Sequence, residues 1–319
     1  MVGAPGTGAV TPHHIPARGW AQVLRRAAVR LFAERFLLLS AGIAFFAVLS
    51  IAPVLLTALS VYGAVNTPEQ AREQLSSWAG MLPVQLEELV AEQLTTITAA
   101  STEVLTARGL TGLVLALWTA TAAMSSLLDA LCLAYHEDET RGVLRRTGFA
   151  LALVLGGAVL LAVVLATTRW VTGAVDGAPD AVRALVGLLV WLALAALMAA
   201  VLAVLYRLAP DRRRARWRWV SGGAVVATAL WVATSVALFT YVQTLGTYEA
   251  TYGSLAGVVI SMFWVWITVL LVVVGAAVNA EAERQTARDS TVGPERPIGE
   301  REAVVADSAP PYRDEEATR

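Results

Sequence analysis

The residue best suited by its type and position to carry out chemistry is Asp129, an acid inside the apolar stretch WTATAAMSSLLDALCLAY. Thr121, Ser125 and Asp129 are spaced four residues apart, so on a helix they form one polar stripe. An ionisable side chain within a membrane span is costly and marks a functional site by default. Two interpretations stay open. Asp129 either binds a proton or cation on a transport path, or it pairs with an arginine such as Arg145 or Arg35.

A second polar group lies in GTYEATYGSLAGVV, residues 246–259, directly before an apolar run. Gly253 suits a tight turn, and Ser254 can start a helix. Tyr252 would then lie at a mouth of the protein. We interpret the segment first as a short hairpin turn between two spans, and second as a gate.

Two further groups of polar residues follow apolar stretches. The last apolar stretch ends in GAAVNAEAER, where Asn279 and Glu281 either line a mouth or form the polar end of a span. HEDET, residues 136–140, is a cluster of acids beside Arg141. It either holds a metal ion or is a solvated turn, and the turn is the favoured interpretation.

The signatures of enzymes are mostly missing. The chain has three histidines, and their spacing offers neither HExxH nor a zinc cluster with cysteine. All its basic residues are arginine, which excludes Schiff-base chemistry and the P-loop lysine. The single cysteine, Cys132, cannot form an internal disulfide. We therefore expect no enzyme, and no catalytic residue, cofactor or metal ion.

The composition indicates a membrane protein. The chain is 57% hydrophobic and 15% charged, whereas soluble domains carry about a quarter charged residues. The net charge of −1 argues against nucleic acid as a partner. A helix needs about 20 mostly apolar residues to cross a bilayer. Six stretches satisfy this requirement and predict an all-α, polytopic helical bundle: 37–64, 109–135, 147–170, 184–208, 219–243 and 253–280.

The arginines orient these spans. They concentrate in residues 1–36, 136–146, 207–218 and 284–301, whereas the alternate connections hold few. The positive-inside rule therefore puts the N-terminus and the C-terminus in the cytoplasm, and the six stretches predict a multi-pass membrane protein.

The parts outside the spans are small. We expect disorder in residues 1–17 and in the cytoplasmic tail 284–319, which has no apolar period. Residues 18–36 predict an amphipathic helix that either lies on the anionic lipid of the inner leaflet or is solvated. The external loop 65–108 predicts two short helices that cap the bundle.

Two features concern packing. Pro53 falls inside the first span and should kink it, because proline removes a backbone donor. Several spans are rich in small residues, including the pair Gly253 and Gly257, which allow helices to approach closely. A homo-oligomer is plausible on this basis.

Three blocks carry a resemblance to a known family: AGIAFFAVLSIAPVLLTALSVYG, LWTATAAMSSLLDALCLAYHEDETRGVLRR, and the stretch from YRLAPDRRRARWRW through TYGSLAGVVISMFWVWITVLLVVVGAAVNAE. Over most of residues 36–283 the chain resembles the YihY/BrkB family of bacterial inner-membrane proteins. YGSLAGV followed by a span that ends in GAAVNAE is that family's hallmark pattern. The resemblance implies a six-span protein of unestablished molecular activity. It marks these positions as an unassigned candidate site: Pro53, Asp129, Tyr135, Arg141, Tyr252, Gly253, Ser254, Asn279 and Glu281.

The leading functional hypothesis is transport of an unknown small solute, ion or lipid. The alternative is a scaffold or virulence-associated protein of the envelope that transports nothing and contacts a partner through the loop 65–108. The family also carries the label ribonuclease BN. A nuclease fits poorly, because such enzymes need clustered metal ligands and a strongly basic surface for phosphate.

Overall fold

The computed structural model describes residues 7–65, 102–244 and 256–308. It confirms the predicted fold class, because this part of the chain is all-α and holds no strand, only an isolated bridge between Ala215 and Thr291. Six helices are long and apolar enough to cross a membrane, and they match the predicted spans to within a few residues at most ends: Phe36–Tyr62, Glu103–Ala134, Val143–Gly173, Asp180–Leu208, Trp217–Val242 and Gly257–Arg284.

The chain divides into two compact units, which are described separately. Unit 1 comprises Met1–Ala44 and Met124–Arg319, and unit 2 comprises Phe45–Ala123. The first predicted span consists of two helices, α2 (Phe36–Leu49) and α3 (Ile51–Val65), with a turn at Ser50 between them. Pro53 explains the interruption, because its nitrogen carries no hydrogen to donate to the carbonyl of Leu49. The predicted distortion therefore lies at Ser50, three residues before Pro53.

In unit 2, small residues let α3 and the first part of α6 (Thr102–Ala134) approach closely. A Cβ on Gly112 would lie 2.7 Å from Thr57 Oγ1 and 3.0 Å from the carbonyl oxygen of Pro53. The Thr57 hydroxyl donates to that same carbonyl at 2.9 Å. Gly112 therefore fits against the first turns of α3, as small residues do where membrane helices pack.

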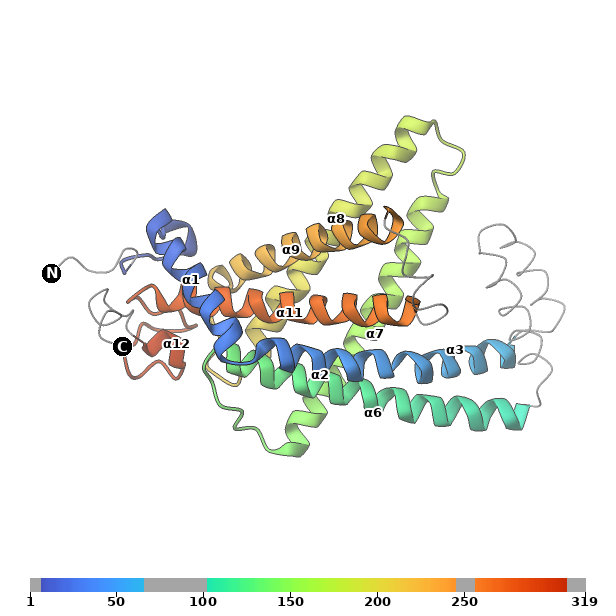
Figure 1. Cartoon of the computed structure of the whole chain (residues 1–319), viewed down its shortest axis with the longest axis horizontal. Coiled ribbons are helices and arrows are strands. Elements are labelled where there is room, and N and C mark those ends of the chain that lie inside the picture. The colour runs from blue at the N-terminus through green and yellow to red at the C-terminus, as the bar shows by residue number, and fades with distance from the viewer. Residues whose placement is uncertain (1–6, 66–101, 245–255, 309–319) are drawn as a thin grey trace. The chain divides into compact units, whose positions relative to one another are not determined.

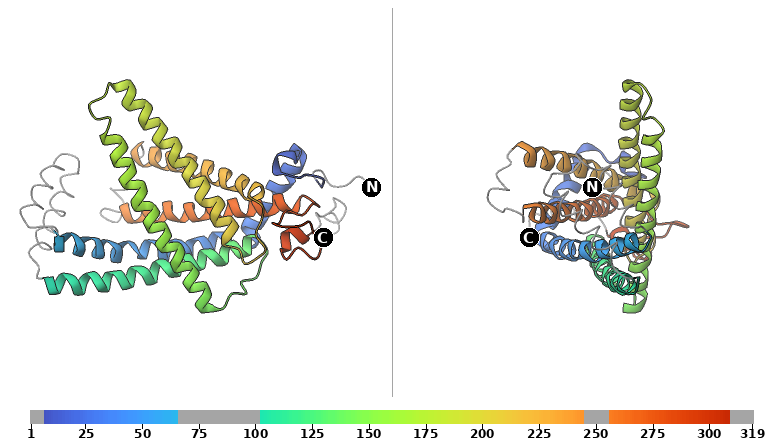
Figure 2. Two further views of the ribbon diagram at one scale, coloured as in Figure 1. Left: turned by 180° about the vertical axis from the view of Figure 1, so that it is seen from behind. Right: turned by 90° about the vertical axis from the view of Figure 1, so that its right-hand side faces the viewer.

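Unit 1 contains most of the remaining helices. α9 (Trp217–Thr244) and α11 (Ala256–Arg284) lie side by side, and α8 (Asp180–Leu208) packs on α9 (Figures 1 and 2). α7 (Val143–Gly173) forms a helical hairpin with α8. α9 and α11 meet at two glycines, since a Cβ on Gly275 would lie 2.7 Å from the carbonyl oxygen of Gly223.

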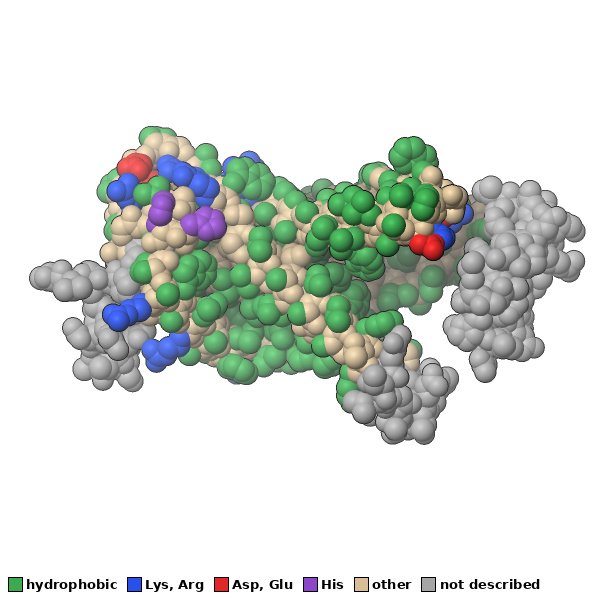
Figure 3. Space-filling model, turned by 90° about the horizontal axis from the view of Figure 1, so that it is seen from above, with side chains coloured by type: hydrophobic (Ala, Val, Ile, Leu, Met, Phe, Trp, Pro, Cys, Tyr) green, Lys and Arg blue, Asp and Glu red, His purple; other side chains and the backbone are tan. Residues whose placement is uncertain are grey.

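Unit 1 has a charged end, which we define by α1 (Ala17–Ala33), residues 133–142, residues 209–216 and residues 279–308. Here α1 and the short helix α12 (Val304–Asp307) both pack on α11 (Figure 1). On the face shown in Figure 3, arginine and histidine side chains gather at this end, whereas hydrophobic side chains cover the middle. The buried apolar core also reaches this end, with Leu131, Tyr135 and Tyr206 fully or almost fully buried.

The chain before α1 differs from the predicted disorder of residues 1–17. A turn of 3-10 helix, η1 (Pro12–His14), precedes α1, and Ala9 and Ile15 are buried in one cluster with Trp219. The Thr286 hydroxyl donates to the carbonyl of Ala9 at 2.6 Å. Residues 7–17 are therefore ordered by contacts with α9 and with the chain after α11. Residues 1–6 lie outside the described residues.

The predicted disorder of residues 284–319 is also not what residues 285–308 show. The Asp289 carboxylate accepts hydrogen bonds from the backbone of Thr291 at 2.9 Å and of Arg296 at 3.0 Å. Arg301 donates to the carbonyls of Ala306 and Ala287 at 2.7 and 2.8 Å. Side chains that bind the local backbone hold this segment, so it needs no apolar period. Residues 309–319 lie outside the described part.

Two other predicted segments can be compared with the structure, one of them only in part. Residues 66–101 of the predicted external loop are not described, and residues 102–108 already belong to α6. The predicted amphipathic helix 18–36 corresponds to α1, which buries Val23 and Ala27 but leaves Leu24 half exposed. Val23 packs near Trp219 and Ala282, and Ala27 packs on Ala277 and Val278 of α11.

Candidate functional site

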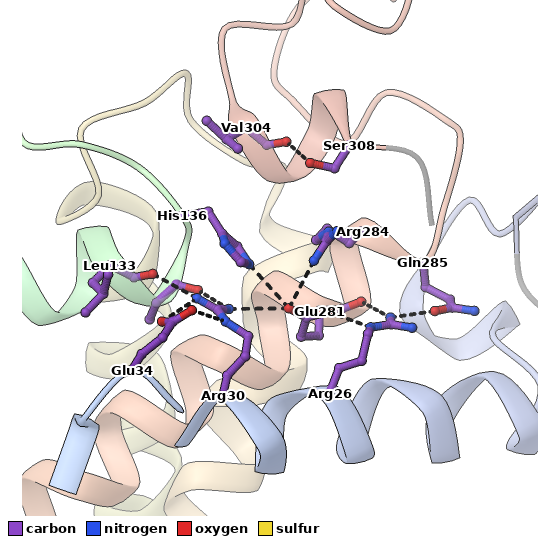
Figure 4. Close-up of polar contacts among 11 residues, drawn as sticks. Arg26, Arg30, Glu34, Leu133, His136, Glu281, Arg284, Gln285, Val304 and Ser308 are labelled. Atoms are coloured by element: carbon purple, nitrogen blue, oxygen red, sulfur yellow. Dashed lines mark hydrogen bonds and ion pairs between the residues drawn. The ribbon is translucent and has the colours of Figure 1, made fainter. Parts of the chain in front are cut away.

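A fully buried carboxylate, that of Glu281 in the last turn of α11, lies at the centre of the charged end (Figure 4). Its Oε2 accepts a hydrogen bond from Arg26 Nε at 2.6 Å. Its Oε1 lies 3.3 Å from Arg30 Nη1, 3.4 Å from His136 Nε2 and 3.6 Å from Arg284 Nη1. We name these five residues the Glu281 cluster. It joins α1, the chain directly after α6, and α11.

Arg30 extends the cluster to the end of α6. Its guanidinium donates to the carbonyls of Ala134 and Leu133, both at 2.9 Å. The last carbonyls of a helix have no partner within the helix, so Arg30 satisfies two of them. The same guanidinium also forms two parallel bonds of 2.8 Å to Glu34, a geometry that arginine and carboxylate favour.

The end of α6 positions His136. This residue has a φ of 57°, in the left-handed region, where helices commonly end. The backbone nitrogen of Glu137 then donates to the carbonyl of Cys132 at 2.9 Å. The local turn therefore directs the imidazole of His136 toward Glu281, as Figure 4 shows.

Asn279, one turn before the end of α11, joins α11 to α9. Its Oδ1 accepts a bond of 2.6 Å from the backbone nitrogen of Gly223, and its Nδ2 donates to the carbonyl of Val220 at 2.8 Å. A Cβ on Gly223 would lie 2.6 Å from Asn279 Cγ, so glycine is required for this approach. Both polar ends of the buried amide are thus satisfied, and Asn279 fixes two helices together.

A second buried ion pair involves Glu283, two residues after Glu281 in α11. Arg212 Nη2 donates to both oxygens of Glu283, at 3.0 and 2.7 Å, and both side chains are almost fully buried. The Arg212 guanidinium also lies 4.7 Å from the ring centre of Tyr135. Burial raises the pKa of the Tyr135 hydroxyl, so Tyr135 is neutral at physiological pH.

Arg141 and the acids of HEDET form a third group. Arg141 donates to Glu139 through Nε and Nη2, both at 2.6 Å, and to the carbonyl of Ala209 at 2.7 Å. Burial opposes ionisation of Glu139, but the Arg141 hydrogen bonds outweigh it and lower the pKa of this carboxyl. Glu137 accepts a bond from the backbone of Val304. These acids therefore bind hydrogen-bond donors, and across the described ranges no group of three or more histidines, cysteines and acids could hold a metal ion.

Asp129 pairs with an arginine. Arg146 Nη2 donates to Asp129 Oδ2 at 2.6 Å and lies 3.3 Å from the carbonyl oxygen of Ser125, one turn earlier on the predicted polar stripe. The partner is Arg146, and not Arg145 or Arg35, which the sequence suggested. The side chain of Asp129 is 45% exposed, so this pair lies at the surface of the described chain.

The predicted site residues thus fall into several places. Asn279 and Glu281 lie in α11 at the charged end, and Tyr135 and Arg141 contact the two neighbouring ion-paired groups. Pro53 belongs to unit 2, where it explains the interruption of the first span at Ser50. Tyr252, Gly253 and Ser254 lie outside the described residues.

Several residues of the charged end were not predicted as site residues from the sequence. Arg26 and Arg30 entered it only as markers of orientation, and His136 only as a candidate metal ligand. A usable signal was the spacing of Arg26 and Arg30, four residues apart on one predicted helix face. Arg284, three residues after Glu281 on the same helix, gave a similar signal, whereas Arg212 and Glu283 gave none.

Comparison with known proteins agrees with the resemblance seen in the sequence. The family model described as Virulence factor BrkB matches residues 27–298. The chain is 28% identical to the Putative ribonuclease-like protein YfkH of Bacillus subtilis, over 53% of this chain and 63% of that protein. It is 31% identical to the UPF0761 membrane protein IL2447 of Idiomarina loihiensis, over 25% of this chain and 28% of that protein.

A third relative, a UPF0761 membrane protein of Alteromonas mediterranea, is 40% identical over 23% of this chain and 25% of that protein. The chain thus covers less than two thirds of the length of each of these relatives. No solved structure matches the chain. The family model extends from α1 to the segment after α11, so it contains four of the five residues of the Glu281 cluster, and Arg26 lies directly before it. The chain is a multi-pass membrane protein and belongs to the Virulence factor BrkB family.

Proposed function

We propose that this chain transports a small solute, an ion or a lipid across the membrane, and that the Glu281 cluster closes the charged end. The observation that carries the proposal is the fully buried carboxylate of Glu281, held by arginines of another helix. Buried ion pairs are poor evidence for stability, because desolvation costs as much as the attraction returns. A set of charges that joins three elements is better suited to a contact that forms and breaks.

The contrast between the two halves of unit 1 supports the same proposal. At the charged end, the helices are joined by buried side chains. Toward their other ends, α9 and α11 leave between them a groove of about 480 Å³ lined by residues such as Thr234, Leu238 and Phe263. A bundle joined at one end and less closely packed at the other resembles one state of a transporter that opens alternately to each side.

We further propose that the charged end faces the cytoplasm, as the positive-inside rule predicts for the arginine-rich connections. In this orientation α1 lies at the inner leaflet, and anionic lipid is its partner. Leu24, Val29 and Phe32 of α1 are exposed, and Arg25 lies beside them, as in helices that bind a membrane surface. Reporter fusions at both termini would contradict this orientation if either were active only outside the cytoplasm.

The transport proposal can be tested with the single cysteine. Cys132 is buried. It directly precedes Leu133, whose carbonyl accepts a hydrogen bond from Arg30. In Glu281→Gln, the contacts with Arg26 and Arg30 weaken, and we expect Cys132 to react with maleimide severalfold faster than in the parent protein. Asp180→Asn is the control, because it removes an exposed carboxylate that is paired with Arg183. This pair lies at the end of α8 remote from the charged end.

The matched functional measurement uses purified protein in liposomes. The probes are a proton gradient with a pH dye, potassium and sodium gradients, and a fluorescent phospholipid. We expect one probe to move faster with protein than without it, and Glu281→Gln to change that rate while Asp180→Asn does not. No movement of any probe, with equal labelling of Cys132 in all three proteins, would contradict the proposal.

One observation favours the second candidate, a scaffold of the envelope. The ion pair between Asp129 and Arg146 gives Asp129 a partner that explains it without a transport path. The scaffold hypothesis predicts that Asp129→Asn leaves function intact, whereas deletion of residues 66–101 abolishes it. The opposite result would favour transport through the polar stripe of α6.

The name of the Bacillus subtilis relative includes the words ribonuclease-like, and we give this activity the lowest rank. His136 contacts Glu281, and the neighbouring acids bind arginine or backbone donors. Cleavage of RNA by the pure protein, lost in both His136→Ala and Asp138→Asn, would restore this hypothesis.

A further inference from the structure

A long groove follows the hairpin of α7 and α8, at its end remote from the charged end. The two helices are joined there by the short connection 174–179 (Figure 1). The groove has a volume of about 590 Å³. It is lined on α7 from Leu160 to Val171 and on α8 from Val186 to Leu197. This volume is within the usual range of sites for small ligands.

The chemistry of the lining indicates an apolar occupant. Ten of the twelve lining residues are Ala, Val or Leu, and the two exceptions, Thr167 and Thr168, lie toward the closed end of the hairpin. Both helices are candidate membrane spans. Because the surroundings of such helices are lipid tails, a hydrocarbon chain can enter the groove from the side.

The length of the groove favours one acyl chain over a helix of a second copy. From Leu160 to Val171 the groove follows α7 for eleven residues, or about 16 Å at 1.5 Å per residue. That is about half of the roughly 30 Å hydrocarbon core of a bilayer. An acyl chain of one leaflet extends over this depth, whereas a partner's spanning helix would follow the whole span.

The closed end of the hairpin carries side chains that suit a membrane interface. Trp170 is 75% exposed, as tryptophans at a membrane interface are. Arg169 is also exposed, on the face of α7 that does not line the groove. We therefore expect the closed end of the groove to lie near the headgroups of one leaflet.

We infer that the groove between α7 and α8 binds one acyl chain of a phospholipid. The lipid belongs to the leaflet at the hairpin end of α7 and α8, remote from the charged end. This inference does not depend on the proposed function, because a bound lipid suits a transporter and a scaffold equally.

The test measures phospholipid retained by the purified full chain. The protein is reconstituted in nanodiscs of phosphatidylethanolamine and phosphatidylglycerol and extracted into mild detergent. Native mass spectrometry then measures the mass of the protein with any phospholipid that it retains. We expect one retained phospholipid per chain. Ala193→Trp fills the groove, and we expect it to abolish this retention. Ala162→Trp is the matched control, because Ala162 is exposed on α7 but does not line the groove.

Arg169→Gln is a second control, because Arg169 is exposed on the face of α7 that does not line the groove, and we expect it to leave retention unchanged. A phospholipid with a photoreactive group on its acyl chain should label peptides 160–171 and 186–197, and do so less in Ala193→Trp. Equal retention and equal labelling in the parent, Ala193→Trp and Ala162→Trp would overturn the inference, as would a parent protein that retains no phospholipid.

Discussion

The charged end of unit 1 and the far half of its helices show two different ways of holding helices together. At the charged end, Glu281 and Glu283 are fully buried and bind arginines from other elements. In the far half, large apolar side chains such as Trp170, Leu189 and Trp191 are more than half exposed, and the helices leave grooves between them. The same helices, α8, α9 and α11, run through both regions.

The difference indicates which region tolerates the loss of a single side chain. At the charged end, specific polar contacts fix the helices in one arrangement. In the far half, lipid must cover the apolar surface, and lipid tails do not favour one helix arrangement over another. We therefore expect substitutions at the charged end to cost the most stability, and those in the far half to cost little.

The largest effect is expected from Arg212→Ala. The substitution leaves the buried carboxylate of Glu283 without its cation, and breaking a buried pair in this way costs about 3–5 kcal/mol. Chemical unfolding in detergent, followed by tryptophan fluorescence, measures the free energy of unfolding. Arg183→Ala is the control, because its pair with Asp180 is exposed and contributes about 0–1 kcal/mol.

A double variant sharpens this prediction. Replacing both partners, in Arg212→Met with Glu283→Leu, removes the uncompensated charge, and we expect it to regain most of the lost stability. If Arg212→Ala were as stable as Arg183→Ala, the buried pair would not contribute to the difference between the two regions.

An intermediate effect is expected from Gly275→Val in α11. A side chain there would lie 2.7 Å from Ala227 Cβ, so α9 and α11 would have to separate, at a cost of about 1–3 kcal/mol. Gly257→Val is the matched control in the same helix, because a Cβ at Gly257 meets nothing within 4 Å. Equal losses of stability in the two variants would mean that the close approach at Gly275 is unimportant.

A smaller effect concerns pH and the segment after α11. Burial opposes ionisation of Asp289, but hydrogen bonds from Thr291 and Arg296 outweigh it and lower the pKa of this carboxyl. The folded state therefore favours the ionised form. This stabilisation is present above the usual pKa of about 4 and is lost as the pH falls through the lowered value.

We accordingly expect Asp289→Asn to lower the unfolding midpoint at pH 7 and to reduce its dependence on pH below 4. Asp138→Asn, at an exposed acid, is the comparison. A pH dependence that is the same in the parent and in Asp289→Asn would show that this carboxylate does not hold the segment.

The smallest effect is expected from Asp129→Asn. The pair with Arg146 is part exposed, so we expect a loss of about 0.2–1 kcal/mol in the free energy of unfolding. Arg146→Gln should lower the free energy of unfolding by the same amount, and the double variant should lower it no more than either single variant. A much larger loss in liposome transport than in stability would instead give Asp129 a functional role.

Much of the fold could be predicted from sequence because it depends on local pattern. The six apolar stretches predict six spanning helices, and Pro53 predicts the interruption that lies at Ser50. The order of residues 285–308 could not be predicted from an apolar period, since it depends on backbone hydrogen bonds that Asp289 accepts and Arg301 donates.

The candidate site was predicted only in part. Asn279 and Glu281 are recognisable because they directly follow an apolar stretch, and because their motif resembles that of a family. Their partners lie far away in the sequence: Arg26 is 255 residues from Glu281, and Asn279 is 59 residues from Val220. No local pattern specifies which distant arginine meets which acid, so these pairs require the structure.

The distance along the chain between Arg26 and Glu281 has a consequence for biogenesis. The ribosome adds about 5–20 residues per second, so α1 emerges roughly 10–50 s before its acidic partner exists. During that interval the guanidinium groups of Arg26 and Arg30 have no Glu281 to bind, and the chain around Thr7 and Ala9 has no Thr286. The charged end is therefore the last part of unit 1 to assemble, after α11 has entered the membrane.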